Sequence, residues 1–321
     1  MSAVMFEKIA LIGIGLIGGS IALEARKRGL AKQIVAATRS AETAALANKL
    51  KLADHCGTDL AAAAEGADLV IVCTPVGACG AVAKAIAPQL KPGCIVSDVG
   101  SVKQTVIADM APHIPKGVHF IPAHPVAGTE NSGPEAALTE LFDGRWTILT
   151  PLPGSDPAAV DKLEAFWKGL GSEVQRLDPA DHDRILAITS HLPHLIAYTI
   201  VGTADDLGGH LNSEVLKYAA GGFRDFTRIA ASDPTMWRDV FLHNKDAVLD
   251  MLATFNEDLS KLTRAMRRGD GDALFDHFAR TRAVRRGILQ IGQDSAAPDF
   301  GRAHPAKPMG TLPRPYAADN E

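Results

Sequence analysis

A glycine-rich segment near the N-terminus constrains the fold of this chain more than any other feature. Residues 8–20 read KIALIGIGLIGGS, which places Gly13, Gly15 and Gly18 in GxGxxG spacing directly after a short apolar run. The first glycine suits a tight turn, the second allows a pyrophosphate to approach the backbone, and the third allows a helix to pack closely on the strand. The pattern predicts a strand, a turn and a helix over 21–28 that ends at Gly29, with a dinucleotide as ligand.

Two other interpretations of this segment were weighed. A structural turn without a ligand has the same glycine pattern, and a secretory signal is suggested because residues 9–23 carry no charge. Glu7 and Lys8 do not form a basic region, however, and no small-residue cleavage site followed by a cysteine-rich chain is present. We therefore expect a cytoplasmic protein.

Composition narrows the possible partners. The 321 residues are enough for two domains with separate cores, and a net charge of -4 provides no positive field for nucleic acid. The four cysteines lie in the first third of the chain without CxxC spacing, so we expect buried thiols rather than disulfides or metal ligands. The longest apolar stretch contains the glycine turn, so no membrane span is expected.

The first part of the chain alternates between apolar runs and helical patterns. This alternation predicts an α/β doubly wound parallel sheet of the Rossmann type, a dinucleotide-binding domain over residues 1–180. The predicted strands are 33–37, 69–73, 94–98, 118–122, 146–150 and 173–177, and the predicted helices are 42–51, 77–89, 102–111 and 157–169.

The second part has helical spacing throughout, which predicts an all-α domain over 181–293 with breaks at 208–209, 221–222, 233–234 and 269–271. In a helix over 244–268, apolar residues from Val248 to Met266 follow a heptad seam. A helix of the same chain and a dimer partner are both suitable neighbours for this seam. The proline-rich residues 294–321 are expected to form a flexible tail.

Ligands of an open parallel sheet bind at the carboxyl ends of its strands. Three segments follow such ends: 74–76, 98–103 and 123–130. His124 lies in the last of these and has the acid-base range to accept a proton from an alcohol as hydride leaves. The alternative is that His124 only caps the strand. Ser101 is a candidate to hydrogen-bond the imidazole, although it also suits a helix N-cap.

The helical domain offers further polar groups. His191 and His194 are three residues apart and can share a helix face, but no acidic third ligand is near, so substrate contact or a core role is expected rather than metal. Arg224 and Arg228 are one turn apart and suit carboxylate binding. A surface salt bridge explains Arg224 equally well, whereas the small and apolar neighbours of Arg228 favour a functional role.

The assembled motifs resemble the prephenate/arogenate (cyclohexadienyl) dehydrogenase family of tyrosine biosynthesis. Five blocks carry the resemblance, in family order: GIGLIGGS at 13–20, DVGSVK at 98–103, HPVAGTENSG at 124–133, SHLPH at 190–194 and GGFRDFTRIAASDPTMWRD at 221–239. The resemblance implies a Rossmann domain, a helical domain that forms a homodimer, and an active site between the two.

The resemblance also implies roles for individual residues. His124 is the catalytic base, oriented by Ser101, and Arg228 binds a substrate carboxylate. His194, more than His191, reaches into the pocket. Other implied substrate contacts are Thr129 and Glu130 at the pocket mouth, Trp237 in its wall, and Arg224. The expected cofactor contacts are Gly13, Gly15, Leu16, Ile17, Gly18, Thr38, Arg39, Ser40, Thr74, Pro75, Val76, Asp98, Gly100 and Ser101.

The implied reaction is oxidative decarboxylation of prephenate or L-arogenate with hydride transfer to NAD(P)+, which yields 4-hydroxyphenylpyruvate or L-tyrosine. After the second strand, Thr38, Arg39 and Ser40 stand where NAD enzymes usually carry an acidic residue for the ribose hydroxyls. A guanidinium there favours NADP, with NAD left open. The alternative is that Arg39 stacks on the adenine.

Two other functions were weighed. A β-hydroxyacid-type dehydrogenase would use a lysine as its acid, and Lys217 and Lys245 are available. A non-catalytic NAD(P) sensor would bind the cofactor without turnover. Both leave His124 and the FRDFTR segment without a role. The preference between prephenate and arogenate, and feedback inhibition by tyrosine, stay open.

Overall fold

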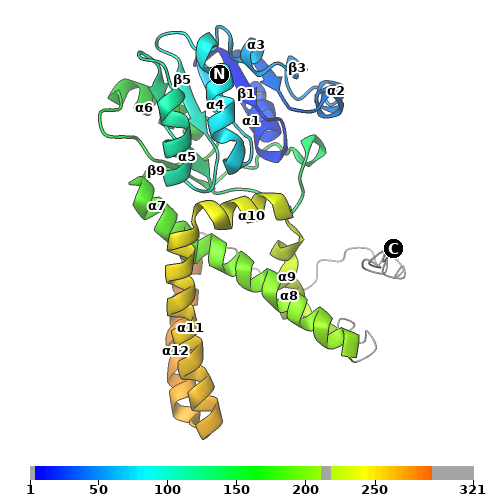
Figure 1. Ribbon diagram of the computed structural model, residues 1–321, viewed down its shortest axis with the longest axis vertical. Helices are drawn as coiled ribbons and strands as arrows, with labels where there is room; N and C mark the ends of the chain where they lie inside the picture. The colour runs from blue at the N-terminus through cyan, green and yellow to red at the C-terminus, as the bar shows by residue number, and fades with distance from the viewer. Residues whose placement is uncertain (1–3, 211–217, 291–321) are drawn as a thin grey trace, which may run out of the picture.

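The computed structural model describes residues 4–210 and 218–290, without the side chains of 208–210 and 288–290. The predicted tail, 294–321, and Lys217 lie outside the described residues. In Figure 1 the molecule divides into a layered α/β half and a helical half with two long arms.

The N-terminal half is built on a parallel six-stranded sheet with the order β3-β2-β1-β4-β5-β6. The strands are β1 (Phe6–Ile12), β2 (Ala31–Ala37), β3 (His55–Gly57), β4 (Leu69–Val72), β5 (Ile95–Asp98) and β6 (His119–Phe120). The helices between them are α1 (Leu16–Lys27), α2 (Ala41–Lys49), α3 (Leu60–Ala64), α4 (Cys79–Ile86) and α5 (Gln104–Met110), with short turns η1 (Val76–Ala78), η2 (Ala87–Gln89) and η3 (Ala111–His113). Two apolar clusters cover the two sheet faces, which confirms the doubly wound Rossmann architecture.

The last predicted strands do not extend this sheet. The segment 118–122 pairs with β5 only as far as Ile121, because Pro122 has no N–H for the ladder. The chain then enters a second sheet with the order β7-β8-β9, in which β7 is antiparallel to β8 and β8 is parallel to β9. Its elements are β7 (Ala123–Pro125), η4 (Pro134–Ala136), β8 (Trp146–Leu149), α6 (Pro157–Gly169) and β9 (Glu173–Arg176). His124 therefore lies within a strand, opposite Ile148, and not in a loop.

Two further predictions for this half need correction. Helix α1 begins at Leu16 rather than at residue 21, because Gly18 and Gly19 belong to its first turns. The short elements β3 and α3 were not predicted, since three residues and an alanine run give almost no periodic signal.

A buried ion pair joins the two sheets. Lys103 and Asp98 both have 0% exposed side-chain surface and form a direct salt bridge. Lys103 Nζ also donates to the Ala123 carbonyl at 2.6 Å, and the Ala123 N–H donates to Asp98 at 3.2 Å. The end of β5 and the start of β7 are thus held together directly beside His124.

The C-terminal half is helical, as predicted. Its elements are α7 (Pro179–Leu186), the π-helical turn η5 (Ala187–His191), α8 (Leu192–His210), α9 (Gly221–Thr227), η7 (Arg228–Ala231), α10 (Pro234–His243), α11 (Lys245–Arg268) and α12 (Gly271–Gln290). In Figure 1, α11 and α12 run side by side as one arm and α8 extends as the other, with α10 beneath the sheet domain. Trp237 and Val240 of α10 join an apolar cluster of the first half, which anchors the helical half.

Most predicted breaks coincide with element boundaries, including Asp233–Pro234 at the start of α10 and the left-handed Gly269 after α11. The break predicted at 208–209 was wrong, because α8 continues to His210. The seam on α11 faces α12 only in part: Val248 is buried, whereas Leu259 is 47% and Met266 is 59% exposed.

One continuous helix, Pro179–Leu207, is long and apolar enough to cross a membrane by length and composition, with a hydropathy of 1.4. A core helix of a soluble protein has the same length and composition, so this helix does not overturn the expectation that no membrane span is present. This helix begins with His182 and Asp183, which are buried against the first half of the chain. The buried apolar residues of this helix are Leu186, Ala187, Leu192 and Ala197.

The buried ion pair generates a stability prediction. Replacing Lys103 with Met leaves Asp98 charged, buried and without its main partner, which we expect to lower the free energy of unfolding by about 3 to 5 kcal/mol. Urea denaturation measures this loss, with the same change at exposed Lys116 as the control. A loss as small as that of the Lys116 variant would contradict the role assigned to the pair.

Candidate functional site

The glycine turn has the geometry of a dinucleotide site. Gly13 has φ +105, and a Cβ on Gly18 would lie 2.2 Å from the Gly13 carbonyl oxygen, so both positions require glycine. A Cβ on Gly15, in contrast, would meet nothing within 4 Å. Gly15 is also the N-cap of α1 and offers no capping side chain, so the helix presents free N–H groups there. The turn therefore fits a pyrophosphate.

The end of β2 lies beside this turn, because the Gly13 N–H donates to the Ala37 carbonyl at 2.7 Å. Of the next residues, Ser40 caps α2 by accepting from the Thr43 N–H at 3.3 Å. Arg39 is exposed and forms no ion pair with any residue that the structure describes. Leu16 and Ile17, half-buried at the start of α1, lie in the same turn.

Residues after β4 and β5 complete the sheet edge. Asp98 was predicted to contact the cofactor, but its carboxylate binds groups of the protein itself. Its carboxylate has no exposed surface and is fully used by Lys103, by the Ala123 N–H and by the Gly100 N–H at 2.7 Å. The side chain of Asp98 therefore shapes the loop and has no surface exposed to a cofactor, so a cofactor contact by Asp98 stays a prediction. Gly100 is buried beside Val76, while Thr74 is half-buried and Pro75 is exposed.

His124 is 8% exposed and is held by a partner that sequence reasoning missed. Its Nδ1 lies 2.9 Å from His182 Nε2, and His182 Nδ1 lies 2.8 Å from Asp183 Oδ1. Asp183 in turn accepts from the Lys103 N–H at 2.7 Å and from the Gln104 N–H at 2.9 Å. A helix of the second half thus supports the predicted base of the first half. The only signal for it was a pair of adjacent His and Asp residues, His182 and Asp183, within α7.

Ser101 is not brought to His124. Its hydroxyl forms no hydrogen bond within the described part of the chain, so the orienting contact on His124 comes from His182 instead. Ser101 lies near His191, whose ring is fully buried. Asn244, also missed from the sequence, lies 3.0 Å from His191 Nδ1 and donates to the Asp183 carbonyl at 2.9 Å.

His194 and Trp237 form a stacked pair, with ring centroids 3.6 Å apart and an angle of 24° between the rings. The His194 ring is oriented further by the Ser190 carbonyl, 2.9 Å from its Nδ1. Two buried nitrogens here, Trp237 Nε1 and His191 Nε2, have no hydrogen-bond partner among the described residues. Both side chains were predicted to contact substrate, and both have a nitrogen available for it.

Arg228 and Glu130 form an ion pair at 2.7 Å that joins the helical half to the loop after β7. The Arg228 side chain is 59% exposed, so the guanidinium retains donors for a further carboxylate. Thr129, exposed in the same loop, accepts from the Asn131 N–H at 3.2 Å. Arg224 is exposed and is not on the same helix as Arg228, because α9 ends at Thr227.

Burial determines the electrostatics of the site. It lowers the pKa of His124 well below its usual value, aided by His182 and Lys103, and lowers the pKa of His191 to about 4. Burial also lowers the pKa of His182, although Asp183 opposes this. Burial would raise the pKa of Asp183, but hydrogen bonds from His182 and two backbone N–H groups outweigh it and lower the pKa. The site therefore holds neutral imidazoles beside an ionised carboxylate.

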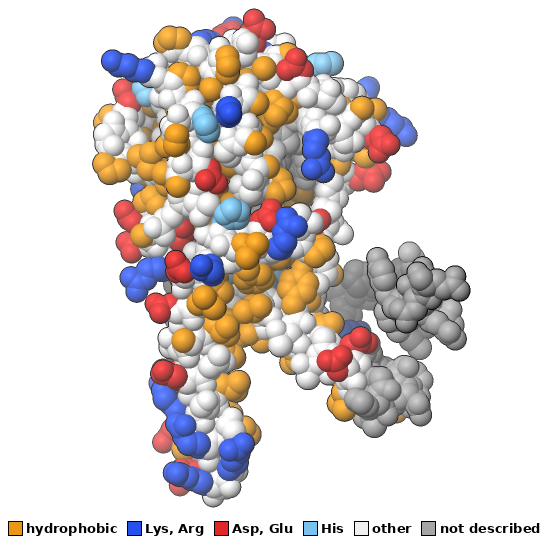
Figure 2. Space-filling model, in the orientation of Figure 1, with side chains coloured by type: hydrophobic (Ala, Val, Ile, Leu, Met, Phe, Trp, Pro, Cys, Tyr) orange, Lys and Arg blue, Asp and Glu red, His pale blue; other side chains and the backbone are white. Residues whose placement is uncertain are grey.

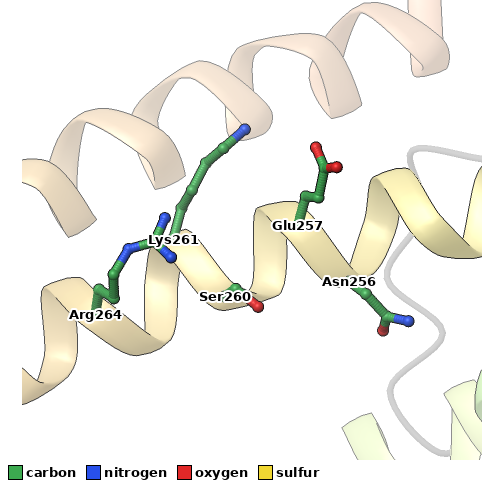
Figure 3. Close-up of a pocket in the computed structure, with 5 residues that line it drawn as sticks. All are labelled: Asn256, Glu257, Ser260, Lys261 and Arg264. Atoms are coloured by element: carbon green, nitrogen blue, oxygen red, sulfur yellow. The ribbon is translucent and has the colours of Figure 1, made fainter.

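Two surface hollows of the described structure lie away from His124 and the glycine turn. A hollow of about 450 Å³ is lined by Asn256, Glu257, Ser260, Lys261 and Arg264, all from one face of α11 (Figure 3). A smaller one of about 270 Å³ lies between the ends of α5 and α6. Within residues 4–210 and 218–290, no three His, Cys, Asp or Glu side chains are grouped to hold a metal ion.

The neutral histidines generate a prediction for stability against pH. The unfolded chain binds protons below pH 6.5 whereas His191 stays neutral to about pH 4, so the free energy of unfolding falls as pH decreases through this range. For His191 alone the loss between about pH 7 and pH 5 is on the order of 2 kcal/mol. Urea denaturation at both values should show a smaller loss for His191→Asn than for the parent and for His55→Gln, an exposed control. Equal losses in all three proteins would contradict this assignment.

Comparison with known proteins agrees with this architecture. Residues 21–176 match the nucleotide-binding domain of prephenate dehydrogenase, and residues 178–280 match its dimerization domain. The cyclohexadienyl dehydrogenase of Zymomonas mobilis is 39% identical over 88% of this chain and 96% of its own length. The prephenate dehydrogenase of Bacillus subtilis is 36% identical over 92% of this chain and 80% of its own.

Solved structures give the same result. The prephenate dehydrogenase of Aquifex aeolicus, crystallised with hydroxyphenyl propionate and NAD+, superposes with a TM-score of 0.81 at 32% identity and covers 90% of this chain and 99% of its own. The arogenate dehydrogenase of Synechocystis superposes with a TM-score of 0.73 at 29% identity, covering 88% and 99%. With its glycine turn, its buried histidine and its two matched domains, this chain belongs to the prephenate dehydrogenase family.

Proposed function

We propose that this chain catalyses the oxidative decarboxylation of prephenate, of L-arogenate or of both, with hydride transfer to NADP or NAD. The observation that carries this proposal is the buried His124, held at Nδ1 so that Nε2 is free to act as base. The names of the relatives support the substrate class, since they are cyclohexadienyl, prephenate and arogenate dehydrogenases.

The residues divide the chemistry between them. His124 takes the proton of the ring hydroxyl, which allows hydride to leave the same carbon while the ring carboxylate departs as carbon dioxide and the ring becomes aromatic. A dinucleotide whose pyrophosphate binds at the glycine turn would supply a nicotinamide as the hydride acceptor. Arg228 holds a substrate carboxylate with the donors that Glu130 does not use. His194 and Trp237 form an aromatic wall that excludes water.

Two buried nitrogens and one carboxylate are candidates for substrate selection. His191 Nε2 and Trp237 Nε1 are buried without partners, and we assign them to acceptors on the bound substrate or cofactor. Glu130 stays ionised because its own backbone N–H and Arg228 lower its pKa, so it offers a negative charge to the amino group of arogenate. The β-hydroxyacid reading gains no support, since Lys245 is exposed at the start of α11.

Assays of purified protein test the reaction. We expect cofactor reduction with prephenate or L-arogenate and none with small hydroxyacids. His124→Asn should lower kcat about 100-fold to 10,000-fold with cofactor binding retained, because it removes the base. Arg228→Ala should lower kcat/KM about 100-fold, mainly through KM, because it removes a charged hydrogen bond to the substrate.

Arg145→Ala provides the control for Arg228, since it removes an exposed guanidinium at a residue with no expected role in the site. Turnover of hydroxyacids alone would contradict the proposal, and so would full activity of the His124 variant. Cofactor binding without turnover of any substrate would favour the sensor function.

For the cofactor we propose a preference for NADP, with Arg39 bound to the ribose phosphate. The exposure of Arg39, its lack of an ion pair within the described chain and its position beside the glycine turn support this preference. The Aquifex relative was crystallised with NAD+, so the proposed preference for NADP rests on the residues after β2 of this chain and not on that relative.

Kinetics with both cofactors test this assignment. Arg39→Ala should lower kcat/KM for NADP about 10-fold to 100-fold, the loss expected for a charged hydrogen bond to phosphate. The value for NAD should stay within about threefold. A similar decrease for both cofactors, or a parent enzyme that prefers NAD, would contradict the phosphate role.

We also propose a homodimer in the cytoplasm, with domains over 1–180 and 181–293. The arms expose large apolar side chains that the helical half does not cover, and Figure 2 shows apolar side chains gathered where the arms diverge. Examples are Leu207, Leu249, Phe275 and Phe278, which are 51–72% exposed. Residues 178–280, which match the dimerization domain of prephenate dehydrogenase, include these four side chains.

A further inference from the structure

We propose that Asp183 and His182 are positioning residues that set the tautomer of His124, so that its Nε2 is the nitrogen with the free lone pair. This inference rests on the proposed function, because it explains how the base of that reaction is prepared. It assigns a role to two buried side chains of the helical half that act through His124.

The chain of contacts starts at Asp183. Its carboxylate accepts from two backbone N–H groups, those of Lys103 at 2.7 Å and Gln104 at 2.9 Å. Asp183 Oδ1, the oxygen that accepts from the Lys103 N–H, also lies 2.8 Å from His182 Nδ1. An ionised carboxylate only accepts hydrogen bonds, so His182 must carry its proton on Nδ1.

The proton positions then follow along the contacts. Neutral His182 with a proton on Nδ1 has its lone pair on Nε2, which lies 2.9 Å from His124 Nδ1. A hydrogen bond between these nitrogens needs one proton, and only His124 can supply it. His124 Nδ1 is therefore protonated, and Nε2 has the lone pair that accepts the hydroxyl proton of the substrate.

The same contacts stabilise the product of proton transfer. When His124 Nε2 gains the substrate proton, a positive charge forms on a side chain that is 8% exposed. The hydrogen bond from Nδ1–H to His182 strengthens, and the negative charge of Asp183 lies at the far side of that ring. The arrangement is comparable in logic to the carboxylate that orients the histidine of serine proteases.

Other charges near His124 do not replace Asp183. Lys103 is paired with Asp98, and both side chains are fully buried. His191 faces the same region and is neutral, since burial lowers its pKa to about 4. Asp183 is thus the carboxylate that is connected to the His124 ring through a side chain, the ring of His182.

Asp183→Asn tests the inference. An amide presents an oxygen at only one of the two positions, so the variant loses one backbone contact in either orientation, and with its NH2 group at the Oδ1 position it donates to His182 and reverses both tautomers. In both orientations the variant also loses the negative charge that stabilises protonated His124. We expect kcat to fall about 100-fold or more, with KM and cofactor affinity within about threefold of the parent. The acidic limb of the pH profile of kcat/KM, which reports the protonation of His124, should also shift along the pH axis.

The matched control is Asp178→Asn. The Asp178 carboxylate caps the same helix by accepting from the Ala180 N–H at 2.8 Å and forms no hydrogen bond with the His182 ring; only the Asp178 backbone carbonyl, which the substitution leaves in place, accepts from the His182 N–H. A general effect of removing an acidic charge near the start of α7 would lower kcat in both variants, because Asn retains the helix cap at position 178. Loss of the tautomer setting should affect Asp183→Asn alone. Equal effects in the two variants would overturn the inference.

A second readout does not depend on activity. Nitrogen-15 NMR of the full protein at neutral pH, with His124→Asn used to assign the signals, should show His124 protonated on Nδ1 in the parent. Protonation on Nε2 would overturn the inference even if the enzyme is active. Conversely, a parent that turns over neither prephenate nor arogenate but shows the Nδ1 proton would refute the proposed function and leave the tautomer assignment standing.

Discussion

The carboxylate of Asp183 is the point on which the site depends. It belongs to the helical half, yet it binds the backbone of Lys103 and Gln104 in the nucleotide-binding half and, through His182, the imidazole of His124. The contact that docks the two halves is therefore also the contact that prepares the base. A separated nucleotide-binding domain would keep His124 but lose the groups that orient it.

Around this carboxylate the protein keeps its buried charges balanced. Asp98 and Lys103 neutralise each other where the two sheets meet, and the surrounding histidines are kept neutral by burial. The more exposed charges, Arg228 and Glu130, lie at the opening, where solvent reduces the cost of separating them. The inner part of the site is thus suited to moving a proton, and the outer part to recognising carboxylates.

The features that could be predicted from the sequence are those that depend on residues close to one another along the chain. The glycine turn, the parallel strands, the break at 233–234 and the helix over 244–268 all follow from local sterics or periodicity, and the structure confirms them. The missed features depend on contacts between distant segments. The His124–His182 pair spans 58 positions and exists only after the halves dock. The separate second sheet follows from Pro122, whose effect on pairing is not visible in hydropathy alone.

The most direct test of the account is a crystal structure of the protein with oxidised cofactor and hydroxyphenyl propionate, the ligand of the Aquifex relative. The account predicts the phenol oxygen about 3 Å from His124 Nε2, with Nδ1 still on His182 and the ligand carboxylate on Arg228. A ring bound away from His124, or an imidazole turned so that Nδ1 faces the ligand, would contradict it.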